Sequence, residues 1–210
     1  MPLVKYDALL KELREASLFT FRTVENRVGE GYAKILIHNL RKRGEIVELI
    51  KGIYTFKKSP YMITKAIPRS YIGLGSAAFL HGAWEQVPRV IVLSPHASLK
   101  ARLGEREISG FKIVLRRISE KMFFGYELKY MEEIDEWIRI SDPEKTLIDT
   151  IYLNYPLKED MVPKLLEIVD KQKIMDYVRI MKTRKIKGWK RVLKELQCCL
   201  EIRNNTKVGT

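Results

Sequence analysis

The hydrophobic positions between residues 19 and 56 follow a helical spacing twice and then an alternating, strand-like spacing. Phe21, Val24 and Val28 recur three and four residues apart, which predicts one face of a short amphipathic helix. Thr20 stands where an N-cap is expected, and residues 29–31, Gly-Glu-Gly, supply a sharp turn at the other end. The pattern therefore predicts a helix followed at once by a turn.

A second helical stripe follows the turn and ends at a glycine. Ala33, Leu36, Ile37 and Leu40 stand at i, i+3, i+4 and i+7, so they form one inward face. Gly44 then stands where a helix commonly ends in a left-handed residue. We expect this second helix to end just before that glycine.

Residues 45–56 predict a β-hairpin. Glu45 to Ile50 is expected as one strand, Lys51-Gly52 as a tight turn and Ile53 to Phe56 as the return strand. Helix, turn, helix and hairpin in this order are typical of a winged helix-turn-helix, which places one helix in the major groove of DNA. The alternative interpretation is a plain pair of helices and a hairpin with solvated lysines.

Polar side chains off the packing stripe of the second helix are the candidates for DNA contacts. A side chain that points away from the core is free to meet base edges or phosphates. The predicted base contacts are Lys34, His38, Arg41 and Lys42, and the predicted phosphate contacts are Tyr32 and Lys51.

The rest of the chain predicts an α+β fold. The expected helices lie at 4–18, 70–84, 142–153 and between 161 and 200, and the expected strands at 89–93, 111–118, 123–130 and 137–140. Lys57-Lys58-Ser59-Pro60 breaks the hairpin and is interpreted as a linker. We expect a winged helix-turn-helix at 1–60, a compact α+β domain at 61–156 and a basic helical extension, packed on the second domain, at 157–210.

Charge is concentrated at the two ends of the chain. The net charge is +13, of which +5 falls in residues 1–60, +1 in 61–156 and +7 in 157–210. Two basic ends around a near-neutral centre favour a polyanionic partner. A lysine-rich surface that serves solubility is the alternative.

The densest basic run is residues 182–191. We predict phosphate contacts from Arg184, Lys185 and Lys187, since cations beside an aromatic residue can follow a nucleic acid backbone. A solvated helix face with Trp189 as its core anchor explains the same run equally well.

No segment predicts a membrane partner or a cofactor. No apolar run approaches the length of a membrane span, and the charged first residues lack the apolar centre of a signal peptide. Cys198 and Cys199 are adjacent and have no ligand-like neighbours, which favours a reducing, cytoplasmic location and no metal site.

Glycines and histidines offer further candidates for a site. Gly73 and Gly75 precede no Lys-Ser/Thr pair at the spacing of a phosphate loop, so we interpret them as positions of close helix packing. His38, His81 and His96 lie far apart and lack ligand spacing. We interpret His81 as a core histidine and expect no catalysis from any of the three.

Residues 142–145, Asp-Pro-Glu-Lys, allow a catalytic interpretation. A metal-dependent nuclease using Asp142, Glu144 and Lys145 needs these groups on a strand edge around Mg²⁺. Pro143 and the Leu-Ile pattern after it indicate a helix start instead. We therefore predict that Asp142 caps a helix and that Asp142, Lys145 and Asp149 lie near one face of it, where they pair locally.

Three stretches in order resemble the AbiEi-type antitoxins, the repressor halves of abortive-infection toxin–antitoxin pairs. The matching stretches are residues 42–46 with 51–54, residues 71–82 with Val87-Pro88 and 90–92, and residues 142–149. They carry the family patterns krGeI with kGiY, a small-residue helix before a short strand, and DPEkTLlD. The resemblance covers roughly residues 15 to 155.

The resemblance implies a transcriptional regulator that binds double-stranded DNA at repeats in its own operator and represses its own operon. It also implies a functional partner, a nucleotidyltransferase-like toxin, which the antitoxin opposes without a stable complex. A homodimer and the direct contact with the toxin stay open. An RNA-binding module, in which the hairpin and the tail bind a folded RNA, is a further alternative.

Overall fold

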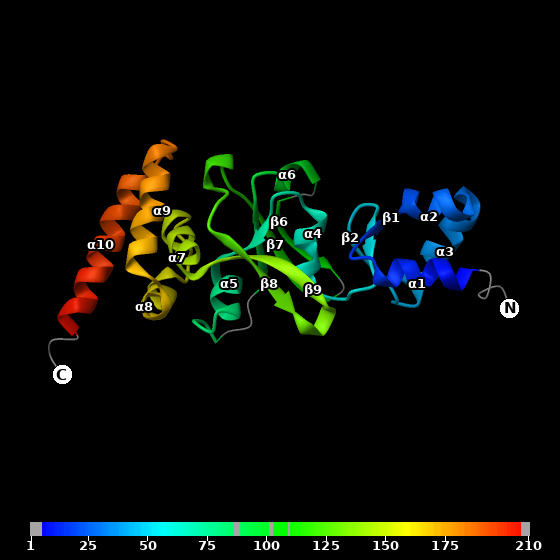
Figure 1. Cartoon of the computed structure of the whole chain (residues 1–210), viewed down its shortest axis with the longest axis horizontal. Coiled ribbons are helices and arrows are strands. Elements are labelled where there is room, and N and C mark those ends of the chain that lie inside the picture. The colour runs from blue at the N-terminus through cyan, green and yellow to red at the C-terminus, as the bar shows by residue number, and fades with distance from the viewer. Residues whose placement is uncertain (1–5, 86–88, 101–102, 109, 207–210) are drawn as a thin grey trace.

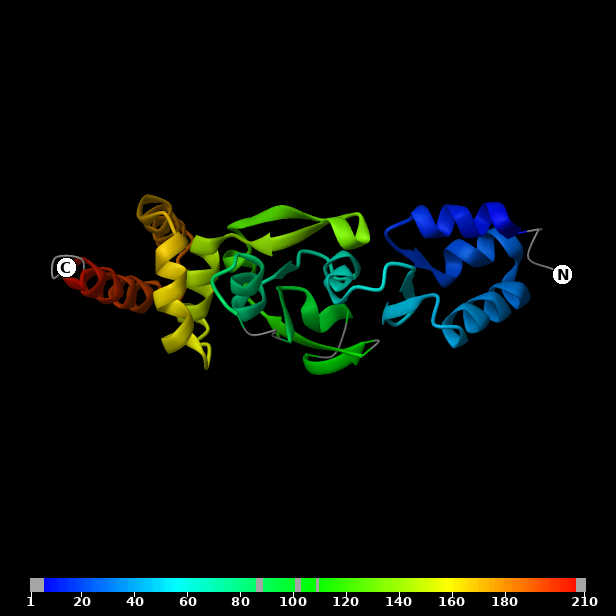
Figure 2. The same ribbon diagram turned by 90° about the horizontal axis from the view of Figure 1, so that it is seen from below.

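The chain has an elongated shape with its ends far apart (Figure 1). The computed structural model describes residues 6–85, 89–100, 103–108 and 110–206. Helices and a small sheet lie at the N-terminal end, a larger sheet lies in the centre, and helices lie at the C-terminal end (Figures 1 and 2). The expected α+β class is confirmed.

The N-terminal part combines short helices with a three-stranded sheet. Its elements are α1 (Asp7–Glu15), β1 (Phe19–Thr20), α2 (Phe21–Val28), α3 (Glu30–Lys42), β2 (Val47–Ile50) and β3 (Ile53–Thr55). The antiparallel strands have the order β1-β3-β2, so the predicted hairpin is present and gains β1 as a third strand. Leu13, Val24 and Leu36 meet in the core that holds the three helices together.

The predicted N-cap of α2 and the predicted end of α3 are confirmed. The Thr20 hydroxyl accepts a hydrogen bond from the N–H of Thr23 at 3.1 Å and so caps α2. The turn expected at 29–31 is too long: Gly29, with φ +80°, makes the turn alone, and Glu30 and Gly31 already belong to α3. After α3, the N–H of Gly44 bonds to Arg41 O at 2.9 Å and that of Glu45 bonds to Leu40 O at 2.9 Å. Glycine fits this helix end because φ is +65° there.

The central part is a six-stranded mixed sheet with the order β6-β7-β5-β4-β9-β8. Its elements are α4 (Ile63–Ala66), β4 (Tyr71–Ile72), α5 (Leu74–Leu80), β5 (Val90–Ser94), α6 (Ala97–Lys100), β6 (Gly104–Ile108), β7 (Phe111–Arg117), β8 (Tyr126–Met131) and β9 (Glu136–Ser141), with 3-10 turns at Pro60–Met62, Glu120–Met122 and Glu132–Ile134. β4 runs parallel to β9 and β5 parallel to β7, while the other neighbouring pairs are antiparallel.

Part of the helix expected at 70–84 is wrong. Tyr71–Ile72 forms strand β4 between β5 and β9, and the helix is limited to Leu74–Leu80. Between them the N–H of Gly73 donates to Ile91 O at 3.0 Å, and a Cβ on Gly73 would lie 2.7 Å from Leu93 Cδ1. The misreading has a cause: β4 is buried on both faces, so its residues lack the alternation that identifies a strand.

The other central strands agree with the prediction within a few residues, with two exceptions. The strand expected at 123–130 begins later, at Tyr126, and β6 was not expected. β6 is an edge strand with a mostly exposed, charged sequence, which gives no hydrophobic signal. Val87-Pro88, part of the family pattern, lie outside the described residues.

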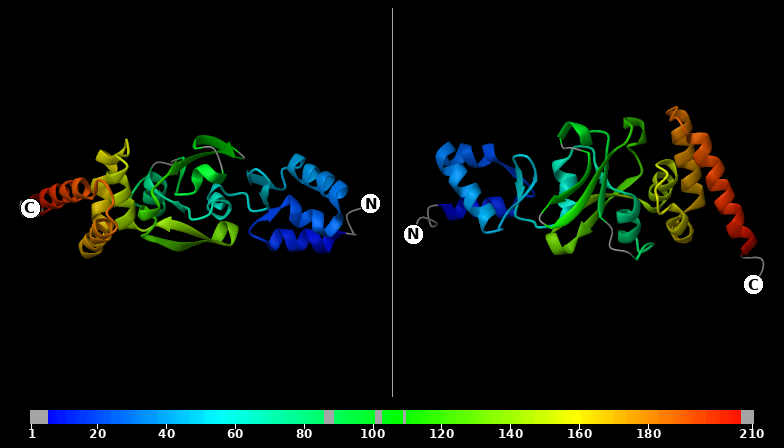
Figure 3. Two further views of the ribbon diagram at one scale, coloured as in Figure 1. Left: turned by 90° about the horizontal axis from the view of Figure 1, so that it is seen from above. Right: turned by 180° about the vertical axis from the view of Figure 1, so that it is seen from behind.

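The C-terminal end is a layer of helices packed on the central sheet. It contains α7 (Pro143–Tyr152), α8 (Lys158–Ile168), α9 (Lys171–Thr183) and α10 (Trp189–Thr206). Leu165, Met181 and Val192 are fully buried and share one core with Leu147 and Leu93. The views of Figure 3 show α8, α9 and α10 together at this end, beyond α7. These helices therefore belong to the folded core.

The N-terminal part docks on the opposite face of the central sheet. Leu49 and Ile50 of β2 share a core with Ile63 of α4 and with Val92 and Ile140 of the sheet. Residues on both sides of the expected linker at 57–60 therefore pack in one hydrophobic cluster.

Candidate nucleic-acid interface

Helix α3 has the two faces that its sequence predicts. Ala33, Leu36, Ile37 and Leu40 are all at most 6% exposed, and they fix the helix against α1 and α2. The predicted base-contacting residues on the other side are all exposed: Lys34, His38, Arg41 and Lys42. The helix consequently presents a cationic surface to solvent.

Two of these cations have carboxylate partners within the protein. Lys34 Nζ lies 2.6 Å from Glu30 Oε1, and Arg41 Nη2 lies 3.1 Å from Glu48 Oε2 on β2. The hydrogen bond between Lys34 and Glu30 raises the pKa of the lysine and lowers that of the glutamate. Exposed pairs of this kind are weak because water screens their charges, so a phosphate or a base edge can replace the carboxylate.

The other predicted contact residues, His38, Lys42, Lys51 and Tyr32, differ from these two in their contacts within the protein. Within the described residues, no carboxylate lies within ion-pair distance of His38, Lys42 or Lys51. Lys51 stands in the turn of the β2–β3 hairpin and is exposed. Tyr32 is half-buried, and its ring stacks on Tyr6 with the ring centroids 4.3 Å apart. Its hydroxyl, not its ring face, is the group left for a phosphate.

The sequence analysis missed two residues on the same surface. Ile35 is 58% exposed, the side chain of Asn39 is also exposed, and both lie beside the predicted cations on α3. Their spacing from Ala33 and Leu36 already placed them off the packing stripe. An apolar side chain suits a thymine methyl group, and an amide suits an adenine edge.

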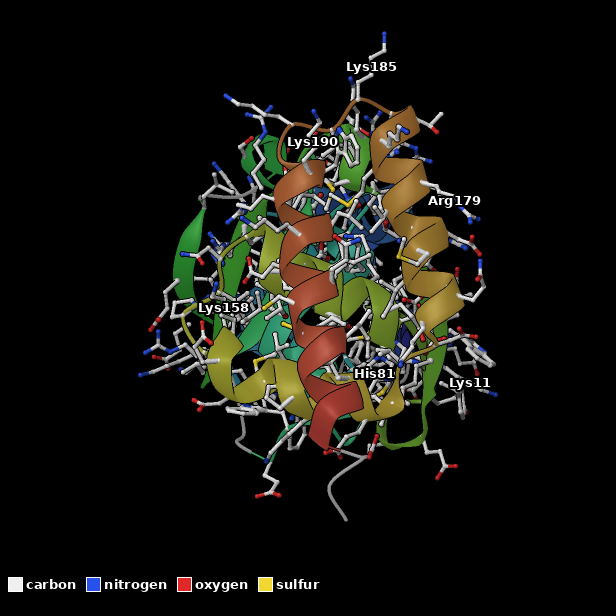
Figure 4. All side chains as sticks on the ribbon, turned by 90° about the vertical axis from the view of Figure 1, so that its left-hand side faces the viewer. Lys11, His81, Lys158, Arg179, Lys185 and Lys190 are labelled. Carbon is white, nitrogen blue, oxygen red and sulfur yellow. The ribbon has the colours of Figure 1, made fainter. Side chains whose placement is uncertain are left out.

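The C-terminal basic run forms a second cationic surface at the α9–α10 connection. Lys182 and Lys190 lie over the Trp189 ring at 5.7 and 5.9 Å from its centroid. Figure 4 shows Lys185 and Lys190 pointing outward at this end of the molecule. Trp189 packs against the core while the lysines face solvent, as the interpretation of a solvated helix face expects, and the exposed lysines are also free to contact a phosphate.

The three residues predicted to contact phosphate in this run differ in whether they already bind another group of the protein. Arg184 Nη1 donates to Lys121 O at 2.9 Å, and the guanidinium lies 5.2 Å from the centroid of the Phe124 ring. Lys185 and Lys187 are exposed and carry no ion pair with any described residue. The two lysines are therefore better placed for a phosphate than the arginine.

Residues 142–145 start a helix, as predicted. Asp142 Oδ1 accepts a hydrogen bond from the N–H of Lys145 at 2.7 Å, and Pro143 is the first residue of α7. Glu144 accepts from the N–H of Asp170 at 2.9 Å and pairs with Lys173 at 2.7 Å. Asp142 and Glu144 are each only 4% exposed, so these carboxylates serve contacts between α7 and α9.

Lys145 belongs to a fully buried polar triad. Its ammonium contacts Asp149 and lies 3.0 Å from the hydroxyl of Tyr71, which donates to Asp149 at 2.8 Å. Burial lowers the pKa of Lys145 and raises the pKa of Asp149 and of Tyr71, although the lysine and the aspartate oppose the shift in each other. The predicted pair is present, and Tyr71 is the partner that the sequence did not indicate.

The other candidates have structural partners. A Cβ on Gly75 would lie 3.2 Å from the Tyr155 hydroxyl, so the interpretation as close packing holds for Gly75 as for Gly73. His81 Nε2 lies 2.7 Å from Ser141 O, and His96 lies 2.7 Å from Glu120. Across the described residues, no group of three or more His, Cys, Asp or Glu side chains has a metal-binding arrangement.

A membrane-spanning helix is absent from the described part of the chain. No protein-family model matches the sequence. No curated protein matches it either.

The fold extends to a solved structure that covers nearly the whole chain. The crystal structure of the RV2827C protein from Mycobacterium tuberculosis superposes with a TM-score of 0.60 over 95% of this chain and 78% of that chain. The sequences are 18% identical over the match. A likeness at this level shows a shared fold across all three parts and assigns no function.

Proposed function

We propose that this protein is a sequence-specific DNA-binding repressor whose N-terminal part acts as a winged helix-turn-helix. Helix α3 is the reading helix, and the β2–β3 hairpin is the wing. The observation that carries the proposal is the division of α3 into a buried stripe and an exposed face with Lys34, His38 and Arg41. A helix held by its neighbours and cationic on its free side suits the major groove.

The two basic surfaces support separate roles in DNA binding. α3 and the α9–α10 connection lie at opposite ends of the molecule (Figure 1), so they meet different stretches of nucleic acid. Phosphate contacts add affinity without sequence information, whereas contacts to base edges discriminate between sequences. We therefore assign specificity to α3 and sequence-independent affinity to Lys185 and Lys187.

The biological setting of the proposal comes from the AbiEi resemblance. In this setting the protein is a cytoplasmic antitoxin, binds repeats in its own operator as a homodimer and acts without catalysis. Its functional partner is a nucleotidyltransferase-like toxin. Among the alternatives, the nuclease loses support because Asp142 and Glu144 are buried in contacts with α9, and nothing on the hairpin favours a folded RNA over a duplex.

A gel-shift titration tests the proposal. The DNA upstream of the gene is compared with a shuffled duplex of equal length and base composition. A protein that neutralises about six phosphates loses roughly a thousandfold in affinity between about 50 and 200 mM salt. We expect tighter binding to the upstream DNA at every salt concentration; equal affinity for the shuffled duplex refutes the specific repressor.

A further inference from the structure

A cavity of about 930 Å³ opens between the central sheet and the segment that joins α7 to α8. Strands β5, β6 and β7 form one side, and residues 154–157 with Trp84 form the other. Ligand pockets of small molecules have volumes of roughly 300–1,000 Å³. The cavity is large enough for a nucleotide-sized molecule.

The inner wall of the cavity is apolar and aromatic. Ile91 and Trp84 are 4% and 7% exposed, and Val114 packs in the same core. The Tyr155 ring is half-buried, and its hydroxyl lies against Gly75, where a Cβ would come within 3.2 Å of it. Gly75 thus leaves the space that seats this ring, and the wall offers a fixed surface to a planar, apolar group.

The cavity also carries two guanidinium groups. Arg116 is half-buried on β7, on the same face of the sheet as Val114, and Arg89 is exposed just before β5. Arg117, the next residue of the strand, points to the opposite face. Arg89 pairs with Glu105 at 2.5 Å, where both side chains are exposed. For Arg116, no carboxylate of a described residue lies within ion-pair distance. Arg116 therefore faces the cavity without a counter-charge, and a phosphate can replace the exposed carboxylate partner of Arg89.

Arg116 and Arg89 influence the hydroxyl of Tyr155 electrostatically. Burial raises the pKa of the Tyr155 hydroxyl, and the positive charges of Arg116 and Arg89 oppose that shift. Both guanidinium groups are consequently close enough to influence a group at the cavity wall. Arginine presents a planar fork of donors that matches a phosphate.

We propose that this cavity binds a nucleotide, with its base against Trp84 and Tyr155 and its phosphates on Arg116 and Arg89. The chemistry is the same for a free mononucleotide and for the terminal nucleotide of a single strand. The inference is independent of the DNA-reading helix, because α3 contributes no residue to the cavity. Its failure and the failure of the repressor proposal are therefore separate results.

Calorimetric titration of the full chain with ADP tests the site. We expect saturable binding of ADP and much weaker binding of adenosine and of pyrophosphate. Adenosine lacks the phosphates that the arginines would bind, and pyrophosphate lacks the base that the aromatic wall would hold. A tetranucleotide of deoxyadenosine with a terminal phosphate identifies the source: tighter binding than ADP indicates a strand end, and weaker binding indicates a free nucleotide. Absence of ADP binding at millimolar concentration, or equal binding of pyrophosphate, overturns the proposal.

Arginine variants locate the bound molecule. Arg116→Gln and Arg89→Gln each remove a charge-assisted contact to phosphate, and we expect each to weaken ADP binding by about tenfold or more. Arg89 is exposed, so its variant keeps the test valid if Arg116→Gln unfolds. The matched control is Arg139→Gln, a half-buried strand arginine outside the cavity with no ion pair to a described residue. Unchanged ADP affinity in both cavity variants refutes the site.

Discussion

The ammonium group of Lys57 lies 2.9 Å from a carboxylate oxygen of Glu136, and this pair connects the N-terminal part to the central sheet. The two side chains are 15% and 8% exposed. Lys65 approaches the other carboxylate oxygen at 3.0 Å, and the Ser17 hydroxyl also donates to Glu136. Residues before β1, after β3 and within α4 therefore converge on one carboxylate at the start of β9, which sets the orientation of α3 relative to the rest of the molecule.

The first prediction concerns this carboxylate. Glu136→Gln leaves two half-buried ammonium groups without a counter-charge, and we expect a loss of about 1–3 kcal/mol in the free energy of unfolding. Urea unfolding at pH 7 measures it. Glu133→Gln, an exposed glutamate just before β9, is the matched control and should be unchanged. Equal midpoints for Glu136→Gln and the wild type contradict the role.

The same pair predicts a pH dependence. Burial raises the pKa of Glu136, but hydrogen bonds from Lys57, Ser17 and Lys65 outweigh burial, and the pKa is lowered overall. Because the folded pKa lies below the unfolded value of about 4.3, the stabilisation is complete above that pH. It is lost as the pH falls through the folded pKa. The stability difference between wild type and Glu136→Gln should therefore shrink on acidification.

The second prediction concerns the reading face of α3. Arg41→Ala and Lys34→Ala should each weaken binding to the upstream DNA by about 1–3 kcal/mol, the range of a direct base contact. The fold should survive, since these side chains are 53% and 64% exposed. Arg27→Ala is the matched control: Arg27 is 60% exposed and pairs with Glu12 at 2.9 Å, but it lies on α2. Full operator affinity in both α3 variants means that another element reads the DNA.

The third prediction concerns the C-terminal cations. Truncation after Tyr155 would remove Leu165 and Val192 from the shared core, so charge substitution is the cleaner test. Lys185→Gln with Lys187→Gln should weaken binding to upstream and shuffled DNA by similar factors. The slope of log affinity against log salt should fall by about 0.9 for each lost phosphate contact. The exposed lysines Lys58 and Lys112, changed to Gln together, serve as the control, and a selective loss of operator binding would show base reading instead.

The fourth prediction concerns the buried triad. Lys145→Met leaves Asp149 buried without its cation, and we expect a loss of about 3–5 kcal/mol in the free energy of unfolding. Adding Asp149→Leu removes the orphaned charge, so the double variant should be more stable than the sum of the single losses predicts. Denaturant unfolding of the four proteins measures the coupling. Strict additivity would mean that the pair contributes no interaction of its own.

Local sequence alone determined much of the fold. The capping residue Thr20, the stop at Gly44 and the start at Asp142-Pro143 act within one helical turn, so no distant partner is needed to interpret them. The stripe from Ala33 to Leu40 likewise defines which face of α3 is buried. The exposed candidates on that helix followed directly from the spacing, and spacing also placed Ile35 and Asn39 there.

Only the tertiary structure decided which distant residues meet. Tyr71–Ile72 became a strand because β5 and β9 pair with it, although its residues alone suit a helix. Lys57, placed in a linker by its neighbours, is anchored by Glu136 far along the chain. The nucleotide-sized cavity likewise brings Trp84, Arg116 and Tyr155 together from separate elements. Pairing and burial depend on partners far away in the sequence, and periodicity reports only on neighbours within a few residues.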